Sequence, residues 1–443
     1  MVDFLIYYET LQREYENAML MKIELERRGY SVRVLNTVYA DYFKSYFIRP
    51  RVIVGQTVRN ERNLHFFTHG SLLGAKKVVN LQYEQVLTKM RESSDFDMPD
   101  GKAVNVFQVC WGDHAYNNLL RHGFKEEMLR KTGAMQFDLL RKEFDGYFKS
   151  KSEIAKEYGM DENTRWVLFN ASFVYASFSE KRMAEIKKEN PFAEKTRNNM
   201  VNAQREIMKW TDEMLSKHPE ITFIYRPHPS EKETSVVREV REKHPNFHYI
   251  GEKSVKQWIK VSDTINVWHS TSGMEAYYAG KQIYVVRPYE LPLEQDIPIY
   301  EGGKKITSCE EYINVNCNAR LETNKTEALN LQRIEDYYGK KEEIPSYKKV
   351  CDFLEDVLKG EYKNQDVIVK STAFYIKREL KYALVTLYVE FVMKTKIKLS
   401  KILPFKKKAL EGWEVSAQRF DRKNLKKVYE DRIREFVTKN FEQ

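Results

Sequence analysis

The sequence predicts an α/β protein in which two domains of alternating strands and helices precede a basic helical extension. Near the N-terminus, an apolar strand at 4–8, an amphipathic stretch at 9–28 and a second strand at 31–35 form a βαβ unit. Such a unit is typical of a parallel sheet with helices on both faces. The same alternation returns between residues 166 and 286. After residue 345 the pattern is helical only, and lysines become frequent.

The length and composition are those of a globular protein. The 443 residues suit two domains of ordinary size with an appendage. Hydrophobic residues make up 42% of the chain and charged residues 31%, which excludes a disordered, collagen-like or low-complexity protein. The four cysteines show no CxxC spacing. We therefore expect no disulfide framework and no zinc site, and a reducing cytoplasm as the compartment.

Two further features bear on location. The first residues, MVDFLIYYE, include no basic segment and meet acidic residues at once, so they do not read as a signal peptide. The longest apolar run, 382–393, has 12 residues and contains Glu390, so it is too short to span a bilayer. We expect a cytoplasmic protein that is soluble or peripheral on the inner face of the plasma membrane.

The first domain is expected to cover residues 1–155. Its first helix carries an i+4 row of apolar residues from Leu11 to Ile23, and Gly29 follows at the position where glycine commonly ends a helix. Further strands are expected at 52–55, 65–68, 78–81 and 104–109, and a helix at 114–121.

The second domain is expected to cover residues 156–345. Apolar runs predict strands at 166–169, 221–225, 264–268 and 283–286, and helices are expected within 180–217 and at 274–278. In parallel sheets, ligands bind beyond the carboxyl ends of the strands. The turns that follow these strands are therefore the first places to look for a site.

One such turn is Arg226-Pro227-His228-Pro229-Ser230. Its two prolines stiffen the turn and are expected to hold Arg226 and His228 out at the edge of the sheet. An arginine and a histidine there suit a phosphate or pyrophosphate through charge-assisted hydrogen bonds. The alternative is a rigid turn with a surface histidine.

A second turn is His269-Ser270-Thr271-Ser272-Gly273, between a strand and a helix. Ser270, Thr271 and Ser272 lie at the expected helix N-terminus, where backbone N–H groups and the helix dipole attract anions. The alternative is plain N-capping. Glu275, inside the helix, is a candidate to accept hydrogen bonds from ribose hydroxyls, or else a solvated helical glutamate.

The first domain offers two candidates for acid–base chemistry. His69, in Thr68-His69-Gly70-Ser71, follows an expected strand, and a histidine titrates near neutral pH. Glu84 also follows a strand, and a carboxylate can act as base or nucleophile. A structural turn histidine is the alternative for His69.

The extension, residues 346–443, is strongly basic. From residue 366 to the end there are 19 Lys and Arg against 10 Asp and Glu, so this part holds +9 of the net charge of +10. One interpretation is an anchor on an anionic membrane surface. The other is a set of helices that pack on the domains and expose lysines. The apolar residues available for insertion are Phe391, Val392, Ile397, Leu399, Ile402, Leu403 and Phe405. Nucleic-acid binding is not expected, because no recognised motif accompanies the charge.

GxGxxG, P-loop, HExxH and GxSxG motifs are absent, which argues against the commonest nucleotide-binding and hydrolase families. An ordered set of short motifs instead resembles the GT-B transferases of bacterial surface polysaccharide synthesis, in which two Rossmann-type domains face a cleft. The likeness is to surface carbohydrate biosynthesis proteins and Kdo or sialyl-type CMP-sugar transferases, and more distantly to CDP-glycerol glycerophosphotransferases. The motifs are Phe67-Thr68-His69-Gly70, Asn80-Leu81-Gln82-Tyr83-Glu84, Cys110-Trp111-Gly112, Thr132-Gly133 with Asp138, Arg226-Pro227-His228-Pro229, and Ser270-Thr271-Ser272 with Glu275 and Gly280-Lys281.

The resemblance implies an acceptor on the first domain and a nucleotide donor on the second, where His228 and Ser270 to Ser272 would hold the donor phosphate. It implies transfer of an acidic sugar from a CMP-activated donor to a glycan or lipid-linked acceptor, for capsule or lipopolysaccharide synthesis, with His69 or Glu84 as base. No metal or other cofactor is expected. The glycerophosphotransferases have Asp-Tyr-Ser-Ser where this chain has Trp268-His269-Ser270-Thr271, which favours a sugar donor. The alternatives are a CDP-glycerol or CDP-ribitol phosphotransferase, a UDP-sugar 2-epimerase-like enzyme, and an inactive assembly partner.

Overall fold

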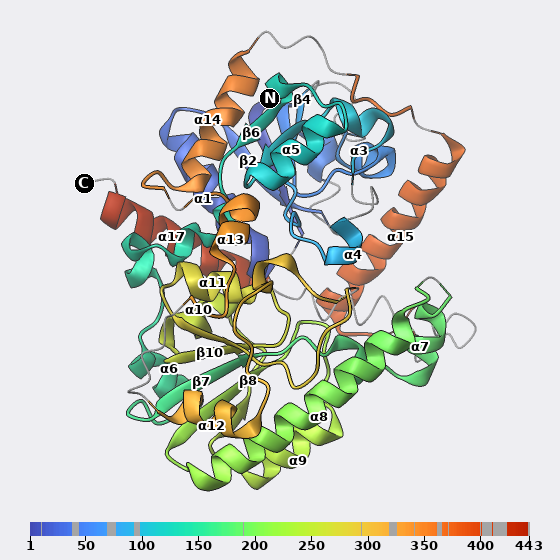
Figure 1. Cartoon of the computed structure of the whole chain (residues 1–443). Helices are drawn as coiled ribbons and strands as arrows, with labels where there is room; N and C mark the ends of the chain where they lie inside the picture. The colour runs from blue at the N-terminus through green and yellow to red at the C-terminus, as the bar shows by residue number, and fades with distance from the viewer. Residues whose placement is uncertain are drawn as a thin grey trace. The chain divides into compact units, whose positions relative to one another are not determined.

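The computed structural model forms two compact units (Figure 1). It describes residues 1–9, 11–37, 44–68, 77–92, 98–188, 190–293, 295–318, 326–340, 342–360, 366–370, 372–398, 400, 410 and 423–441. The first unit comprises residues 1–85, 97–138 and 337–443, and the second comprises residues 86–96 and 139–336.

This grouping differs from the expected domains at three places. Residues 86–96 and 139–155 join the second unit, and the chain from residue 337 returns to the first. The reason for the return is helix α14 (Ser346–Lys359), whose buried face includes Val350, Phe353 and Leu354. This face packs on the first sheet, so α14 belongs to the body of the first unit and not to an appendage.

The first unit is built on a parallel sheet of six strands in the order β2-β1-β3-β4-β5-β6. The strands are β1 (Val2–Tyr8), β2 (Val32–Asn36), β3 (Pro50–Gly55), β4 (Lys77–Asn80), β5 (Phe107–Cys110) and β6 (Leu129–Lys131). The helices are α1 (Glu16–Arg27), α3 (Glu61–Thr68), α5 (Asp113–Arg121), α14, α15 (Ala373–Thr395) and α17 (Lys423–Phe441). A π-helical turn, Leu11–Tyr15, leads into α1.

Both faces of this sheet are covered, as the βαβ pattern predicts. On one face α1 packs against α14, and α14 lies on β3 and β4. On the other face Leu5, Tyr7 and Ile53 pack against α3 and against Val367 and Val369 from the C-terminal region.

One expected strand of the first unit is wrong. Residues 65–68 belong to helix α3, not to a strand. The sequence pattern allows this because Leu64, Phe67 and Thr68 are spaced to share one buried face of a helix. In addition, the Asn60 side chain accepts a hydrogen bond from the Asn63 backbone N–H at 2.9 Å, as an N-cap does. The motif that contains His69 therefore follows a helix.

The second unit has a parallel sheet of five strands in the order β11-β10-β7-β8-β9. The strands are β7 (Arg165–Asn170), β8 (Ile221–Arg226), β9 (Phe247–Tyr249), β10 (Thr264–Val267) and β11 (Gln282–Val285). The helices are α4 (Lys89–Glu92), α6 (Lys151–Tyr158), α7 (Glu180–Ile186), α8 (Ala193–Lys217), α9 (Ser235–Lys243), α10 (Val255–Val261), α11 (Ser272–Tyr278), α12 (Cys309–Cys317) and α13 (Leu331–Tyr338), the last of which runs into the first unit.

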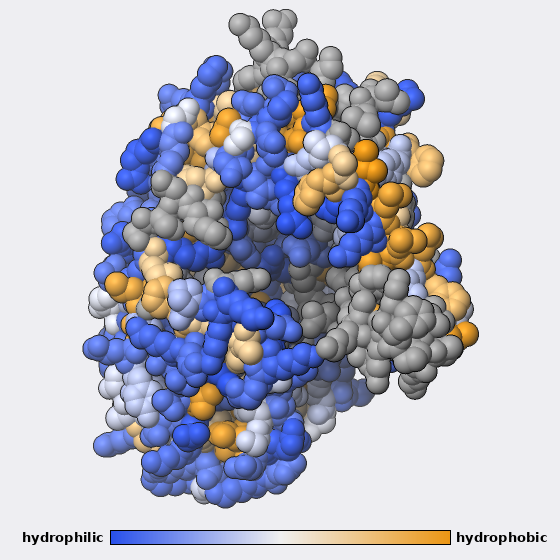
Figure 2. Space-filling model, turned by 90° about the vertical axis from the view of Figure 1, so that its right-hand side faces the viewer, coloured by the Kyte–Doolittle hydropathy of each residue, from blue (hydrophilic) through white to orange (hydrophobic). Residues whose placement is uncertain are grey.

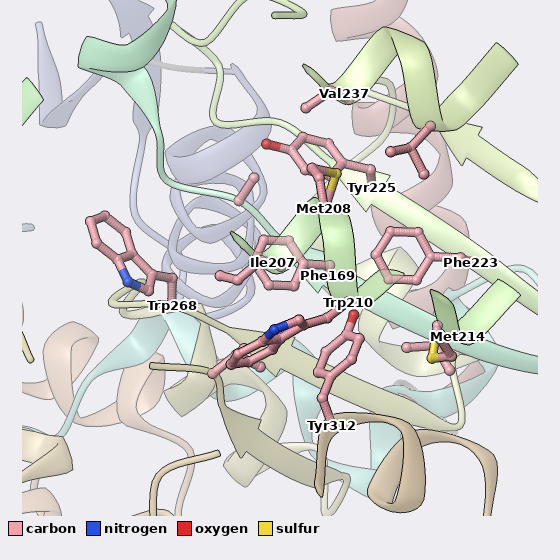
Figure 3. Packing of buried hydrophobic residues seen from close by; sticks show 14 of the residues in the cluster. Phe169, Ile207, Met208, Trp210, Met214, Phe223, Tyr225, Val237, Trp268 and Tyr312 are labelled. Atoms are coloured by element: carbon pink, nitrogen blue, oxygen red, sulfur yellow. The ribbon is translucent and has the colours of Figure 1, made fainter. Parts of the chain in front are cut away.

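Aromatic side chains dominate the core of the second unit (Figure 3). Phe169 of β7 lies at the centre, and Phe223 and Tyr225 of β8 lie beside it. Long helix α8 covers this face with residues such as Trp210, whose ring is 5.9 Å from that of Tyr312 on α12. The strand ends that carry the candidate site thus rest on a buried hydrophobic layer.

In the basic C-terminal region, helices α17 and α15 pack in different ways. Helix α17 packs on α1, where the Tyr15 hydroxyl donates to Glu430 at 3.1 Å and Arg434 pairs with Glu26 at 3.1 Å. Helix α15 packs through one face only. Within the described residues, no helix is long and apolar enough to cross a membrane.

Candidate functional site

The second sheet has a topological switch point between β7 and β10. From β7 the chain continues to β8 on one side and later returns to β10 on the other. Ligands of such sheets bind beyond the carboxyl ends of the strands at this point. Asn170, the last residue of β7, is in register with Val267, the last residue of β10. The segments that follow these two residues therefore define the candidate site.

Buried polar groups gather at these two strand ends. The amide of Asn170, the hydroxyl of Ser172, the indole N–H of Trp268 and Nε2 of His269 are buried and have no hydrogen-bond partner among the described residues. In folded proteins such groups are almost always paired with protein, water or ligand. Four of them at one sheet edge make this a candidate place for a polar ligand or for ordered water.

His269 is a neutral imidazole in this place. Burial, followed by the nearby positive charge of Arg287, lowers its pKa to about 4. Its ring lies edge-on against Trp268 with ring centroids 4.6 Å apart. A neutral histidine with an unpartnered Nε2 can accept or donate one hydrogen bond, depending on its tautomer.

His228 lies in the stiff turn after β8 and is exposed. Its Nδ1 accepts a hydrogen bond from the backbone N–H of Ser230 at 3.2 Å. An accepting Nδ1 places the proton of the neutral ring on Nε2, which makes Nε2–H the donor. The expected exposure of His228 at the sheet edge is thus observed.

A buried carboxylate, Glu231, holds this turn in place. Its side chain accepts hydrogen bonds from the Tyr225 hydroxyl at 2.6 Å and from the Phe173 backbone N–H at 2.8 Å. Its own backbone N–H donates to the His228 carbonyl at 2.8 Å. Burial raises the pKa of Glu231 to about 6. Glu231 therefore ties the segment after β7 to the turn after β8.

Arg226 is placed differently from the expectation. Its side chain is buried, and its guanidinium donates to the carbonyls of Glu252 at 2.8 Å and Lys253 at 2.7 Å. A buried guanidinium needs such acceptors, because an unpaired charge is costly to bury. Arg226 thus supports a neighbouring loop and does not extend beside His228 as predicted.

The hydroxyl-rich turn after β10 is locally ordered. The Ser270 and Ser272 hydroxyls are 2.9 Å apart, and Ser270 Oγ also accepts the Ser272 backbone N–H at 3.2 Å. Thr271 is exposed and makes no side-chain cap. Helix α11 begins at Ser272, two residues before the predicted start, and Glu275 lies half-buried in its first turn. Ser270 therefore performs local capping, and the capping alternative explains part of this motif.

A close contact fixes the backbone of this turn. The Tyr300 hydroxyl donates to the Ser270 carbonyl at 2.6 Å. A Cβ on Gly273 would lie 2.1 Å from the same hydroxyl. Gly273 is thus required because a tyrosine occupies the space of a side chain.

Sequence reasoning missed the charged groups beyond β11. Arg287 donates to the Trp268 carbonyl at 2.5 Å and faces Asp296 at 3.4 Å. Asp296 also pairs with Lys89 at 3.0 Å. Burial lowers the pKa of Arg287. A signal was present, because Arg287 is followed by a proline after a strand, as Arg226 is.

The first unit assembles a charged cluster beyond β1 and β4. Arg13, in the π-helical turn, donates to Glu14 at 2.7 Å and pairs with Glu84 at 3.3 Å. Arg59 is 3.7 Å from Glu84. The Glu9 backbone N–H donates to Glu14 at 2.6 Å, and burial followed by the Glu14 charge raises the pKa of Glu9.

Glu84 thus meets two arginines, and its side chain is half-exposed. The first sheet reverses its order between β1 and β3, so this cluster lies at the strand ends where ligands are expected. π-Helical turns are frequent at functional sites. His69 lies outside the described residues.

Several solved structures share this fold. A UDP-N-acetylglucosamine 2-epimerase is 13% identical with a TM-score of 0.53, over 84% of this chain and 99% of that chain. A Listeria monocytogenes protein described as a UDP-N-acetylglucosamine 2-epimerase is 11% identical with a TM-score of 0.51, over 83% of this chain and 100% of that chain. A variant of the wall teichoic acid polymerase TagF, soaked with CDPG, is 10% identical with a TM-score of 0.52, over 81% and 88%.

Neither a protein-family model nor a curated protein matches the sequence. At the identities above, the likeness establishes the fold alone. It confirms the predicted fold class, a GT-B-like pair of Rossmann-type α/β domains with a helical C-terminal region.

Proposed function

We propose that this chain is a glycosyltransferase of surface polysaccharide synthesis that binds a nucleotide-activated sugar on its second unit. The observation that supports this most is the set of buried, unpartnered polar groups of Asn170, Ser172 and His269 at the switch point of the second sheet. They suit a ligand rich in hydroxyl and carbonyl groups. His228 and the Ser270–Ser272 hydroxyls at the neighbouring strand ends suit the phosphate of that ligand.

The proposed donor is a CMP-activated acidic sugar of the Kdo or nonulosonate type. Such a nucleotide sugar carries a single phosphate, which uncharged hydrogen-bond donors of the protein can bind. Arg226 is committed to two backbone carbonyls, so the Nε2–H of His228 and the serine hydroxyls are assigned the phosphate. Glu275 is assigned the ribose hydroxyls. This choice of donor rests on the motif resemblance.

The proposed chemistry is loss of CMP with attack of an acceptor hydroxyl at the anomeric carbon. Hydrogen-bond donors already positioned by the Glu231 network stabilise the charge that develops on the leaving phosphate. A group of the first unit, Glu84 or His69, takes the proton of the acceptor hydroxyl. Of these two candidates, Glu84 lies within the described residues, where its carboxylate is 3.3 Å from Arg13 and 3.7 Å from Arg59.

A UDP-sugar 2-epimerase is the second candidate, because two of the similar folds belong to proteins described so. A CDP-glycerol transferase is the third activity to be tested, because the fold is similar to that of TagF. These three activities require different substrates and leave different products, so one set of assays separates them.

The test is turnover of three substrates by the purified full-length chain. We expect CMP release from a CMP-linked acidic sugar, and no release of CMP from CDP-glycerol. Solvent deuterium incorporation into UDP-N-acetylglucosamine would establish the epimerase instead. Replacing His269 or His228 with alanine is expected to lower turnover at least about tenfold, since each removes a hydrogen bond to the ligand. His218→Ala is the matched control, because His218 precedes β8 at the opposite edge of the sheet.

A further inference from the structure

Helix α15 is held on the first unit through one face. The ring of Tyr375 stacks on His65 of α3 with centroids 4.0 Å apart, and Arg378 donates to His65 Nδ1 at 3.0 Å. Farther along, the Tyr382 hydroxyl donates to a backbone carbonyl at 3.3 Å. Val389 is fully buried near the end of the helix. These contacts hold the N-terminal half of α15 on the first unit, and the C-terminal half has a buried face of its own.

The opposite face of α15 carries large apolar side chains that are exposed. We call Ile376, Leu380, Leu384, Leu387 and Phe391 the α15 stripe. The three leucines are 63%, 65% and 64% exposed. At 3.6 residues per turn, the five side chains fall within an arc of about 80°. A continuous apolar strip of this kind marks an interaction surface.

Figure 2 shows the side of the molecule that carries α15 in Figure 1, and hydrophobic residues gather in a band toward the upper right-hand edge of this view. The α15 stripe does not form the buried face of the helix, because other residues form that face. These inward residues include Thr386, Val389 and Val392, which are buried.

Basic side chains border the α15 stripe. Lys377 and Lys381 are exposed on one side of it, and Lys394 and Lys396 are exposed at its C-terminal end. Two acidic residues lie on the other side of the stripe: Glu390 is half-buried, and Glu379 accepts a hydrogen bond from the Tyr46 hydroxyl at 3.0 Å. An apolar strip with a positive border matches the apolar interior and anionic headgroups of a lipid surface.

We propose that α15 lies flat on an anionic membrane and inserts the α15 stripe into the headgroup region. This inference does not depend on the donor or on the reaction. It also revises the predicted insertion residues. Phe391 and Ile397 are exposed as the anchor requires, but Val392 is buried. Leu399, Ile402, Leu403 and Phe405 lie outside the described residues.

The test is flotation of the full-length chain with vesicles of phosphatidylcholine, with and without phosphatidylglycerol. We expect binding only to the anionic vesicles. The triple variant Leu380→Ser, Leu384→Ser and Leu387→Ser is expected to bind at least about tenfold more weakly, because the inserted apolar area is lost. The matched control replaces three exposed apolar residues elsewhere with serine: Leu293, Leu331 and Ile344.

The charge contribution is tested separately. Lys377→Glu with Lys381→Glu is expected to weaken binding about tenfold at low salt, and the difference should shrink in high salt, because screening weakens attraction to anionic lipids. Binding that is equally strong to neutral vesicles, or unchanged in the leucine triple variant, would overturn the proposal. The proposal would also be overturned if the full-length chain bound no vesicles but associated with itself, and the leucine triple variant lost this self-association.

A milder variant guards against misfolding of the triple variant. Leu384→Trp places a fluorophore on the α15 stripe, and Ile344→Trp places one on an exposed site elsewhere. Addition of anionic vesicles should shift the emission of the first to shorter wavelength and leave the second unchanged. Equal behaviour of the two probes would contradict insertion of the stripe.

Discussion

The contact between Gly273 and Tyr300 provides a quantitative test of the site geometry. In Gly273→Ala the new Cβ would lie 2.1 Å from the Tyr300 hydroxyl, so the tyrosine must move and its 2.6 Å hydrogen bond to the Ser270 carbonyl is lost. Overpacking and a broken buried hydrogen bond together cost about 2–4 kcal/mol. Tyr300→Phe alone removes the bond without a clash and costs about 1–2 kcal/mol.

The double variant is expected to be less damaged than the sum of the two single variants. Once the hydroxyl is absent, the next nearest atom to the new Cβ is the Tyr300 ring carbon Cζ at 3.1 Å, which a small shift accommodates. Its stability should therefore equal that of Tyr300→Phe within about 0.5 kcal/mol. Calorimetric melting of the full chain measures this, at about 2–4 °C per kcal/mol for a domain of this size. Additive losses in the double variant would refute the steric account.

Two further predictions concern stability. In Glu231 the pKa rises from 4.5 to about 6 on folding, so the fold favours the neutral acid. The associated stability is present below pH 4.5 and is lost, by about 2 kcal/mol, as pH rises through 6. Glu231→Gln should reduce the change of melting temperature with pH in this range. An unchanged slope would contradict the assignment of this pH dependence to Glu231. Asp138 accepts the backbone N–H groups of Ser346 at 3.0 Å and Tyr347 at 2.6 Å at the start of α14. Asp138→Ala should lower the first unit's stability by about 1–3 kcal/mol in denaturant unfolding, with Ser346→Ala, whose backbone donor remains, as the milder control.

Asp138 illustrates what a motif can and cannot reveal. The motif resemblance drew attention to it, together with Thr132-Gly133, but assigned it no role. The structure gives it a structural task, since it supplies the missing acceptors at the N-terminus of a helix more than 200 residues later in the chain. Only the tertiary contact reveals this, because no local pattern links the two segments.

Most strands could be predicted because short apolar runs between turn residues are a strong local signal. The run at 65–68 misled because a few apolar residues fit a helix as well as a strand, and the Asn60 cap decides between them. The short strands β6 and β9 were missed, since three residues at a sheet edge carry little periodicity.

The candidate site was predictable in its position but not in its chemistry. Strand ends and turns indicated where His228 and Ser270 would lie. The commitment of Arg226 to loop carbonyls and the isolation of the His269 Nε2 depend on packing from distant segments. Glu231 was not singled out because its partners come from two different segments: Phe173 follows β7, and Tyr225 belongs to β8.

Nucleotide binding by the second unit is the central claim, and its most direct measurement is the melting temperature of the full chain with CMP, CDP, UMP, UDP or GDP. A ligand at about 100 times its dissociation constant adds about 2.7 kcal/mol, which shifts the melting temperature by several degrees. We predict a shift with the cytidine nucleotides that is lost in His228→Ala and His269→Ala and retained in His218→Ala. The absence of a shift with every nucleotide, or a shift that both site variants retain, would contradict the account.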